Sequence, residues 1–163
     1  FKEMTVIENI KSAINMHMKY SIPEAILRLP RYFQEEAEIH QEALDLLRVF
    51  DMEEYADHHA SNLPYGRQRK LEIARALATK PKLLLLDEPA AGMNPTETAE
   101  LMTTIATLRE SFDLSILLIE HDMNLVMGIC EEIIVIDYGT IIAKGTPDEI
   151  RKDANVIGAY LGE

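Results

Sequence analysis

The stretch LLLLDEP, residues 83–89, constrains the fold more than any other part of the sequence. Its four consecutive leucines lie between Pro81 and Pro89 and are too few for a helix, so they predict a short strand. An uninterrupted apolar run is typical of a strand covered on both faces, as in a parallel sheet. Ligands bind at the carboxyl ends of such strands. The sequence therefore predicts that Asp87 and Glu88, which follow the leucines directly, lie at a ligand-binding edge.

The remaining pattern is helical before residue 80 and alternates between strands and helices after it, which indicates an α/β fold. Thr5 and Glu8 form a capping box at the start of the first predicted helix, and Pro23 and Pro30 are expected to interrupt the region that follows. The predicted helices cover residues 5–18, 34–50, 52–56, 64–77 and 95–110, with a short one from 122. A second capping box, Thr146 with Glu149, predicts the start of a C-terminal helix. The predicted strands cover residues 83–86, 115–119, 133–137 and 141–143, the last two forming a hairpin.

Composition narrows the classes of partner. A chain of 163 residues is long enough to bury a core. Its net charge of −12 argues against nucleic acid as a partner, because a nucleic-acid-binding protein needs a basic face. No apolar run approaches the ~20 residues that cross a bilayer, so we expect no direct membrane span.

Cys130 is the only cysteine, which excludes an internal disulfide and predicts a buried, inert thiol in a reducing, cytoplasmic setting.

The two adjacent carboxylates suit phosphoryl transfer. This reaction needs one carboxylate to hold Mg²⁺ and another group to orient the attacking water. Asp87 is the candidate for the metal and Glu88 the candidate for the water. The alternative is a strand followed by solvated acids, and the motif by itself does not separate the two interpretations.

His121 follows the second predicted strand directly, in LLIEHDM. It is expected to emerge at the same edge of the sheet as Asp87 and Glu88, where a neutral imidazole can hydrogen-bond a phosphate and the attacking water. A histidine at a strand end is otherwise an ordinary loop residue.

The stretch SNLPYGRQRKLEIARAL, residues 61–77, resembles a helix N-terminus that holds an anion. Pro64 suits the first helical position, and Gly66 permits close approach of a ligand to the backbone. Basic residues add positive charge: Arg67, Arg69, Lys70 and Arg75. The alternative is a surface helix with solvated arginines.

Taken together, these motifs resemble the second half of an ABC transporter ATPase. LPYGRQR resembles the signature sequence LSGGQQR, LLLLDEP resembles the Walker B strand, and AAGMN resembles the D-loop. Longer segments resemble the ATP-binding subunits of branched-chain amino acid transporters, among them FKEMTVIENI, LLIEHDMNLVMGIC and GTPDEIRKDANVIGAYLGE. The resemblance covers nearly the whole chain and is weakest between Ser21 and Glu54.

The resemblance implies a partial P-loop NTPase (RecA-like) core with parallel strands, an α-helical subdomain, and a C-terminal hairpin and helix. Residues 1–79 would form the helical subdomain with the signature helix, and residues 80–163 the catalytic half of the core. The implied cofactors are ATP and Mg²⁺. The implied activity is ATP hydrolysis coupled to import of branched-chain amino acids. The implied partners are a second ATP-binding subunit, in a homo- or heterodimer, and transmembrane permease subunits, at the cytoplasmic face of the cell membrane.

The resemblance also implies roles for individual residues. Glu88 would be the catalytic glutamate, His121 the switch histidine and Asp87 the metal ligand. The implied contacts to nucleotide held by the other subunit are Leu63, Pro64, Tyr65, Gly66, Arg67, Gln68 and Asn94.

Several departures from the family pattern qualify this expectation. No G-x-x-x-x-G-K-[ST] motif occurs in the sequence, and we interpret the chain as starting after the P-loop and Q-loop of a longer protein; a naturally short protein is the alternative. Alone, the chain is expected to expose apolar faces and strand edges and to be inactive. Pro64 and Tyr65 replace a serine and a glycine, and Asn94 replaces an aspartate. We interpret these replacements as subfamily variation.

A second hypothesis is a non-catalytic interaction module in which the helical subdomain docks on a membrane permease without hydrolysis. Titration of the 163-residue chain with Mg-ATP separates the two hypotheses, because tight binding excludes the module. DNA repair ATPases have similar motifs but are disfavoured by the acidic charge.

Overall fold

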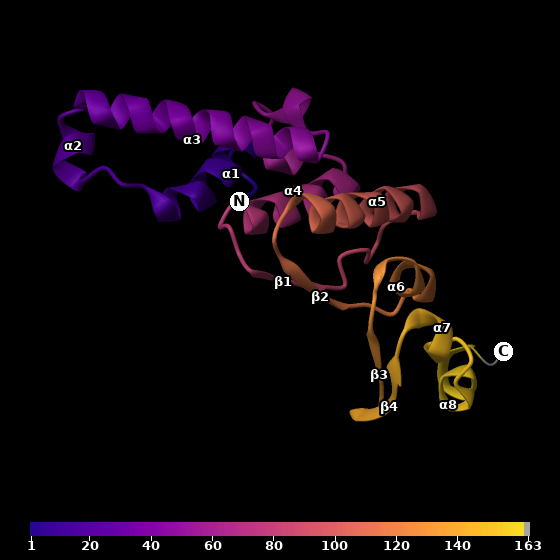
Figure 1. Ribbon diagram of the computed structural model, residues 1–163. Helices are drawn as coiled ribbons and strands as arrows, with labels where there is room; N and C mark the ends of the chain where they lie inside the picture. Colours follow the sequence, from indigo (N-terminus) through magenta and orange to yellow (C-terminus); the bar gives the residue numbers. More distant parts are fainter. Residues whose placement is uncertain (162–163) are drawn as a thin grey trace. The chain divides into compact units, whose positions relative to one another are not determined.

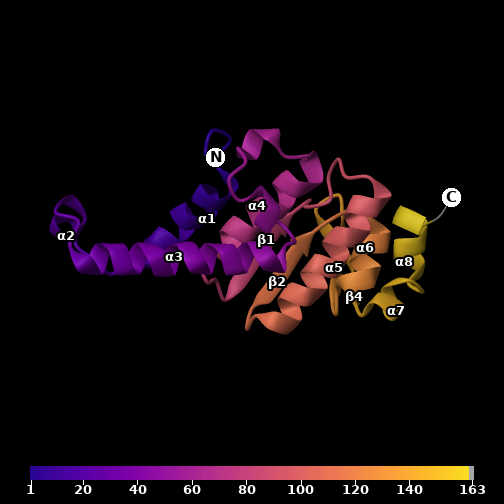
Figure 2. The same cartoon turned by 90° about the horizontal axis from the view of Figure 1, so that it is seen from above.

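The computed structural model describes residues 1–161, which divide into two compact units. The first unit comprises residues 1–86 and 109–117, and the second comprises residues 87–108 and those from 118 onward. Figure 1 and Figure 2 show the elements of each unit in two views. The last two residues of the segment GTPDEIRKDANVIGAYLGE lie outside the described residues. The predicted division into a helical subdomain, residues 1–79, and a catalytic half, residues 80–163, stays a prediction.

The first unit begins with a helical region. Its helices are α1 (Val6–Ile14), η1 (Asn15–His17), α2 (Ile22–Ile26), α3 (Pro30–Val49), η2 (Glu53–Tyr55), η3 (Ala60–Asn62) and α4 (Tyr65–Leu77). The helical region is interrupted before Pro23 and Pro30, as predicted, by residues 18–21 and 27–29. Each proline lies in the first turn of a helix, α2 or α3, where its missing N–H costs no intrahelical hydrogen bond.

The capping box predicted at the start of α1 is confirmed. The Thr5 hydroxyl accepts a hydrogen bond from the Glu8 amide at 3.2 Å, and the Glu8 carboxylate accepts one from the Thr5 amide at 2.8 Å. Two of the amides that a helix N-terminus leaves unpaired are thereby satisfied. The helix ends at Ile14 and continues as the short η1, close to the predicted end.

The core of the first unit forms where α1 packs against α3 and α4. Apolar residues on the facing sides of these helices are fully buried, as their helical spacing predicts. The side chains that lose nearly all solvent contact are Val6, Ile10, Leu47, Phe50, Met52 and Ala74.

Strands β1 (Leu83–Asp87) and β2 (Ser115–Ile119) form a two-stranded sheet. The Ser115 amide donates to the Lys82 carbonyl at the start of both strands, and the Glu88 amide donates to the Ile119 carbonyl at their end. The strands therefore run parallel, as predicted.

The prediction that β1 is covered on both faces was wrong. Leu84 and Leu86 are buried, but Leu83 and Leu85 are more than half exposed. Successive side chains of a strand point to opposite faces, and residues 1–161 cover only one of them. The expected exposure of apolar faces is thereby confirmed.

The second unit contains most of α5 (Pro95–Ser111), then α6 (Met123–Ile129), β3 (Ile133–Asp137), β4 (Thr140–Gly145), α7 (Pro147–Ile150), α8 (Ala154–Val156) and a π-helical turn at Ile157–Leu161. The predicted hairpin is confirmed, since β3 pairs antiparallel with β4. Tyr138 and Gly139 both have positive φ, 45° and 78°, the geometry of a type I′ turn.

The core of the second unit is a small cluster around Ile133, Ile150 and Val156. Cys130 packs against it but is only partly buried, so the predicted burial of its thiol holds in part. Cys130 forms no disulfide, as the sequence requires.

Leu47→Ala tests the importance of the packing of α3 on α1. Leu47 is fully buried, so the cavity left by the substitution is expected to lower the free energy of unfolding by about 2–5 kcal/mol in a denaturant titration. Leu27→Ala is the matched control, because Leu27 is 68% exposed, and its effect is expected to stay within about 0.5 kcal/mol. Equal effects of the two variants would contradict the assignment of the core.

A second capping box starts α7, where the Glu149 carboxylate accepts from the Thr146 amide at 2.8 Å and from its hydroxyl at 2.9 Å. The two capping boxes predict a dependence of stability on pH. Hydrogen bonds from the Thr5 and Thr146 amides hold the pKa of Glu8 and of Glu149 below the usual glutamate value. Because the folded pKa is depressed, the stabilisation is complete above the unfolded pKa of about 4.3 and is lost as the pH falls through the folded value. The double variant Glu8→Gln, Glu149→Gln is therefore expected to lose less stability than the wild type between about pH 6 and about pH 3. Denaturant midpoints measure this, with Glu38→Gln on the exposed side of α3 as control; parallel curves for double variant and wild type would refute the assignment.

Candidate functional site

The site in the second unit begins where β1 ends. Asp87 is the last residue of the strand, and Glu88 follows it with its amide held by the Ile119 carbonyl at 2.8 Å. This hydrogen bond extends the parallel pairing by one residue and fixes where the Glu88 side chain leaves the sheet. Both carboxylates are exposed.

Glu88 has a strained backbone, with φ of +43°. A residue other than glycine reaches this left-handed region at a cost of order 1–3 kcal/mol, and such residues cluster at functional sites. The strain turns the chain sharply after β1, and the Glu88 carbonyl accepts a hydrogen bond from the Ala91 amide at 3.1 Å within that turn.

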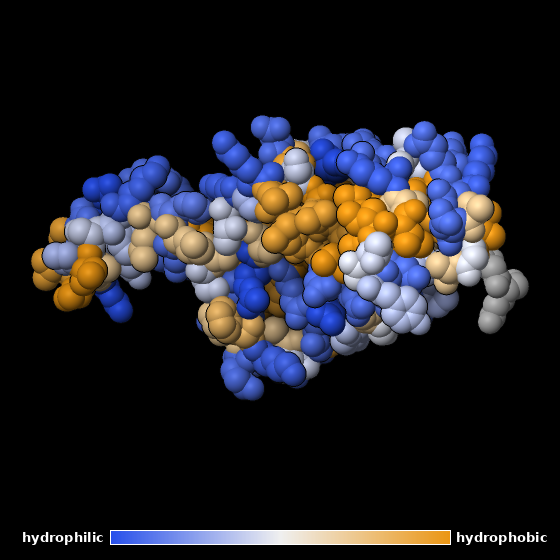
Figure 3. Space-filling model, turned by 90° about the horizontal axis from the view of Figure 1, so that it is seen from below, coloured by the Kyte–Doolittle hydropathy of each residue, from blue (hydrophilic) through white to orange (hydrophobic). Residues whose placement is uncertain are grey.

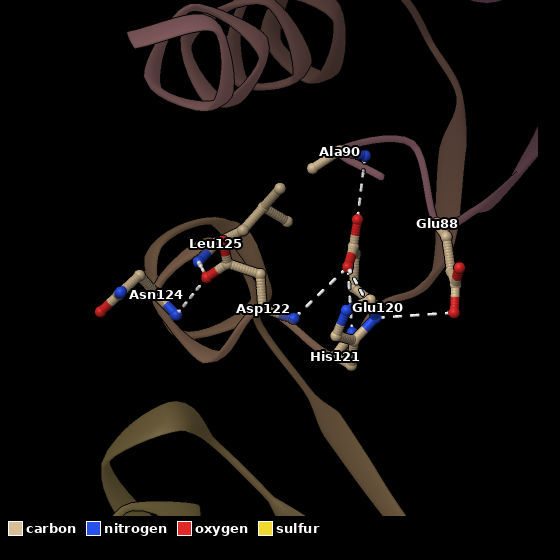
Figure 4. A network of polar contacts seen from close by, with 7 residues as sticks. All are labelled: Glu88, Ala90, Glu120, His121, Asp122, Asn124 and Leu125. Carbon is tan, nitrogen blue, oxygen red and sulfur yellow. Dashed lines mark hydrogen bonds and ion pairs between the residues drawn. The ribbon is translucent and has the colours of Figure 1, made fainter. Parts of the chain in front are cut away.

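His121 lies beside Glu88, as its place after β2 predicts (Figure 4). Its Nδ1 atom is 3.5 Å from a carboxylate oxygen of Glu88. Both side chains are more than half exposed, at 72% and 54%, so a ligand can reach them. A carboxylate that can accept a proton and an imidazole that can donate or accept one thus face the same opening.

Glu120 holds this arrangement and was missed by the sequence analysis. Its side chain is 1% exposed. One carboxylate oxygen accepts from the Ala90 amide at 2.9 Å, and the other accepts from the His121 amide at 3.0 Å and the Asp122 amide at 3.3 Å (Figure 4). Glu120 therefore joins the loop after β1 to the loop after β2. The alternation of β2 places residue 120 on the inner side of the sheet edge, and a glutamate at such a position was the available signal.

Asn94 lies at the end of the loop that follows Glu88. Its side-chain oxygen accepts from the amides of Thr96 and Glu97, both at 3.0 Å, and the Glu97 carboxylate accepts from the Asn94 amide at 3.0 Å. Asn94 is therefore the N-cap of α5. Asn94 itself is exposed, and its predicted contact with nucleotide stays a prediction.

The residues at the end of β1 fit a magnesium ion that is held together with a nucleotide. Among residues 1–161 the Asp87 carboxylate accepts no hydrogen bond, so its oxygens are available. No group of three or more histidine, cysteine, aspartate or glutamate side chains able to hold a metal occurs in the part of the chain that is described. Magnesium is usually held by one or two carboxylates plus phosphate oxygens and water, which is the pattern that Asp87 suits.

The signature-like residues Leu63–Gln68 belong to the first unit. Pro64 was predicted at the first helical position but is the N-cap of α4, one residue earlier, with an extended ψ of 151°. A proline N-cap has no side-chain acceptor, and within residues 1–161 the amides of Tyr65, Gly66 and Arg67 make no hydrogen bond. These three amides are the donors that a helix N-terminus offers to an anion.

The other residues of this stretch stabilise the start of α4. Leu63 is buried, and its carbonyl accepts a hydrogen bond from the Gln68 side chain at 2.8 Å. Gly66 is also buried, and Tyr65 is 43% exposed.

The basic side chains of α4 are already engaged. Arg67 donates to the Asp51 carbonyl at 2.6 Å and lies over the Tyr55 ring. Arg69 donates to Glu72 and to the Tyr65 hydroxyl, and these hydrogen bonds raise the pKa of its guanidinium. Arg75 lies over the Phe1 ring, and Lys70 is buried. The positive charge expected around this helix start is thus largely used within the first unit.

Comparison with known proteins agrees with this geometry. A family profile described as ABC transporter matches residues 1–91, and one described as branched-chain amino acid ATP-binding cassette transporter matches residues 140–163.

Relatives of known sequence include the high-affinity branched-chain amino acid transport ATP-binding proteins LivG of Salmonella typhimurium, 50% identical, and BraF of Pseudomonas aeruginosa, 45% identical. In both cases the similarity covers all of this chain and 64% of the relative, so the chain spans less than two thirds of their length.

The ADP conformation of MJ1267, an ATP-binding cassette of an ABC transporter, has a similar structure. It superposes with a TM-score of 0.78 at 28% identity, over 99% of this chain and 64% of that one. This likeness confirms the predicted P-loop NTPase fold class. Since the ABC transporter profile matches more than half of its residues, the chain belongs to the ABC transporter family.

Proposed function

We propose that this chain is part of an ATP-hydrolysing subunit that drives import of branched-chain amino acids. The approach of Glu88 to His121 at the carboxyl ends of two parallel strands is the observation that carries the proposal. The amino acid class rests on the names of relatives up to 50% identical and on the match over residues 140–163.

In the proposed reaction Glu88 acts on the attacking water. Its carboxylate accepts a proton from the water as the water attacks the terminal phosphorus of ATP; the bond from this phosphorus to the bridging oxygen breaks, and ADP and phosphate leave. His121, held 3.5 Å away, hydrogen-bonds the terminal phosphate and keeps the water in line. Asp87 would hold Mg²⁺, which supplies charge neutralisation on the phosphates when bound.

The uncapped start of α4 has a separate role in the proposal. The amides of Tyr65, Gly66 and Arg67 would bind the phosphates of nucleotide held by a second ATP-binding subunit, with Leu63, Pro64, Gln68 and Asn94 shaping that contact. Backbone amides aligned with a helix dipole favour an anion without any basic side chain. Their unpaired state within residues 1–161 supports this assignment.

The assembly proposed for the subunit follows from its relatives. The solved structures similar to this chain include a dimeric ABC transporter cassette, MJ0796. No helix among the described residues is long and apolar enough to cross a bilayer. Because the relatives are named as ATP-binding proteins of amino acid transport, we infer that transmembrane permease subunits provide the membrane path, and that this subunit lies at the cytoplasmic face against them, in a homo- or heterodimer.

Glu88→Gln tests the proposed catalytic role of Glu88. The test uses a protein that carries this chain together with a P-loop. Loss of the proton-accepting carboxylate is expected to lower kcat for ATP hydrolysis by about 10²–10⁴-fold while ATP binding persists, because the amide keeps the shape of the side chain. Phosphate release and nucleotide titration measure the two quantities. Glu110→Gln on the exposed side of α5 is the matched control and is expected to leave kcat unchanged. A Glu88→Gln protein with near wild-type kcat would exclude the proposed role.

Glu120→Gln tests whether the buried carboxylate positions the two loops. The amide keeps one acceptor oxygen and replaces the other with a donor, so at least one of the amides at Ala90, His121 and Asp122 is expected to lose its partner, at a cost of about 1–3 kcal/mol. Hydrogen exchange at these amides is expected to accelerate, and kcat to fall more than the affinity for ATP. Glu132→Gln, an exposed glutamate paired with Lys144, is the control. Unchanged exchange at all three amides would show that Glu120 does not hold the loops.

A further inference from the structure

The turn between α1 and α3 carries a group of apolar side chains that are between 41% and 77% exposed. We call residues 16–33 the apolar tip. Ile22 and Ile26, both on α2, are 77% and 75% exposed. The other exposed apolar residues of the tip are Met16, Met18, Leu27, Leu29 and Phe33. Figure 3 shows apolar surface at the left-hand end of the view, with hydrophilic surface beside it.

Other contacts hold the conformation of the apolar tip. The Glu24 carboxylate accepts from both the amide and the hydroxyl of Ser21 at the start of α2. The Tyr20 hydroxyl donates to Glu36 at 3.0 Å, and the Tyr20 ring packs edge-on against Tyr32 with 5.2 Å between centroids. The exposed apolar side chains are therefore not needed to form the turn and remain available to a partner.

The charge of the apolar tip is opposite to that of the chain. Residues 16–33 contain Lys19, Arg28 and Arg31 but only one acidic residue, Glu24, a net charge of +2 in a chain of −12. Glu24 pairs with Arg31 at 3.6 Å. Within residues 1–161 neither the Lys19 ammonium nor the Arg28 guanidinium forms an ion pair. Glu35 lies just beyond this range, and its carboxylate accepts a hydrogen bond from the Lys19 amide, so the net charge around the apolar side chains is +1 when Glu35 is counted.

We propose that the apolar tip docks on the surface of a bilayer that contains anionic phospholipid. Short segments with apolar side chains on one side and basic residues beside them bind at the boundary between headgroups and acyl chains. Ile22, Ile26 and their neighbours enter that boundary, and Lys19 and Arg28 contact lipid phosphates. The contact places the subunit against the membrane without a spanning helix and requires no nucleotide, so it stands independently of the proposed ATPase activity.

Cosedimentation with vesicles tests the proposal, in a protein that carries this chain together with a P-loop. Binding is expected to vesicles of phosphatidylcholine mixed with phosphatidylglycerol, and to be much weaker with phosphatidylcholine alone. Lys19→Gln with Arg28→Gln is expected to weaken binding by about fivefold per charge removed, with a shallower dependence on salt. Ile22→Ser with Ile26→Ser is expected to weaken it by about tenfold or more.

Two matched double variants in the second unit serve as controls. Ile134→Ser with Ile141→Ser removes two exposed isoleucines from the hairpin, and Lys144→Gln with Arg151→Gln removes the same charge elsewhere. Both are expected to bind like the wild type, and circular dichroism checks that every variant is folded. Equal weakening by the control variants, equal binding to both kinds of vesicle, or no binding to either would overturn the proposal. If the protein bound purified permease in detergent but bound no vesicle, the partner of the apolar tip would be a protein, and the proposal would be wrong.

Discussion

Parallel pairing of β1 with β2 is the interaction on which the site depends. The hydrogen bond from the Glu88 amide to the Ile119 carbonyl aligns the ends of the two strands. The residues that follow each strand then lie at one edge of the sheet, although they are far apart in the sequence. A shift of register by one residue would turn every side chain to the opposite face and separate Glu88 from His121.

The loops at that edge are fixed by a buried acceptor, and the catalytic candidates themselves remain exposed. Glu120 satisfies amides from both loops, while the positive φ of Glu88 aims its side chain towards His121. Such a division between a rigid support and accessible reacting groups is what preorganisation requires. The strained conformation of Glu88 persists because the hydrogen bonds on either side of it determine the path of the chain.

The basic composition of α4 suggests an anion site built from arginine side chains, whereas the start of this helix offers one built from backbone amides. Its arginines neutralise or stack on groups of the first unit, and the unpaired donors are backbone amides. Pro64 accounts for this, because a proline N-cap provides no side-chain oxygen that would compete for those amides. In the apolar tip, local hydrogen bonds hold the conformation of the chain, and the large apolar side chains remain exposed.

Local signals in the sequence determined most of the elements. Capping residues, proline positions and apolar periodicity act within a few residues, so the capping boxes, β2, the Tyr138-Gly139 hairpin and α5 were predicted close to their observed bounds. The order of motifs likewise identified the family, and the strand ends located Glu88 and His121. The sequence alone could not assign Glu120, since its role depends on amides contributed by two loops. Nor could it decide which face of β1 is covered, which arginines are engaged, or that α2 leaves its isoleucines exposed. These features depend on packing between distant segments, which only the tertiary structure fixes.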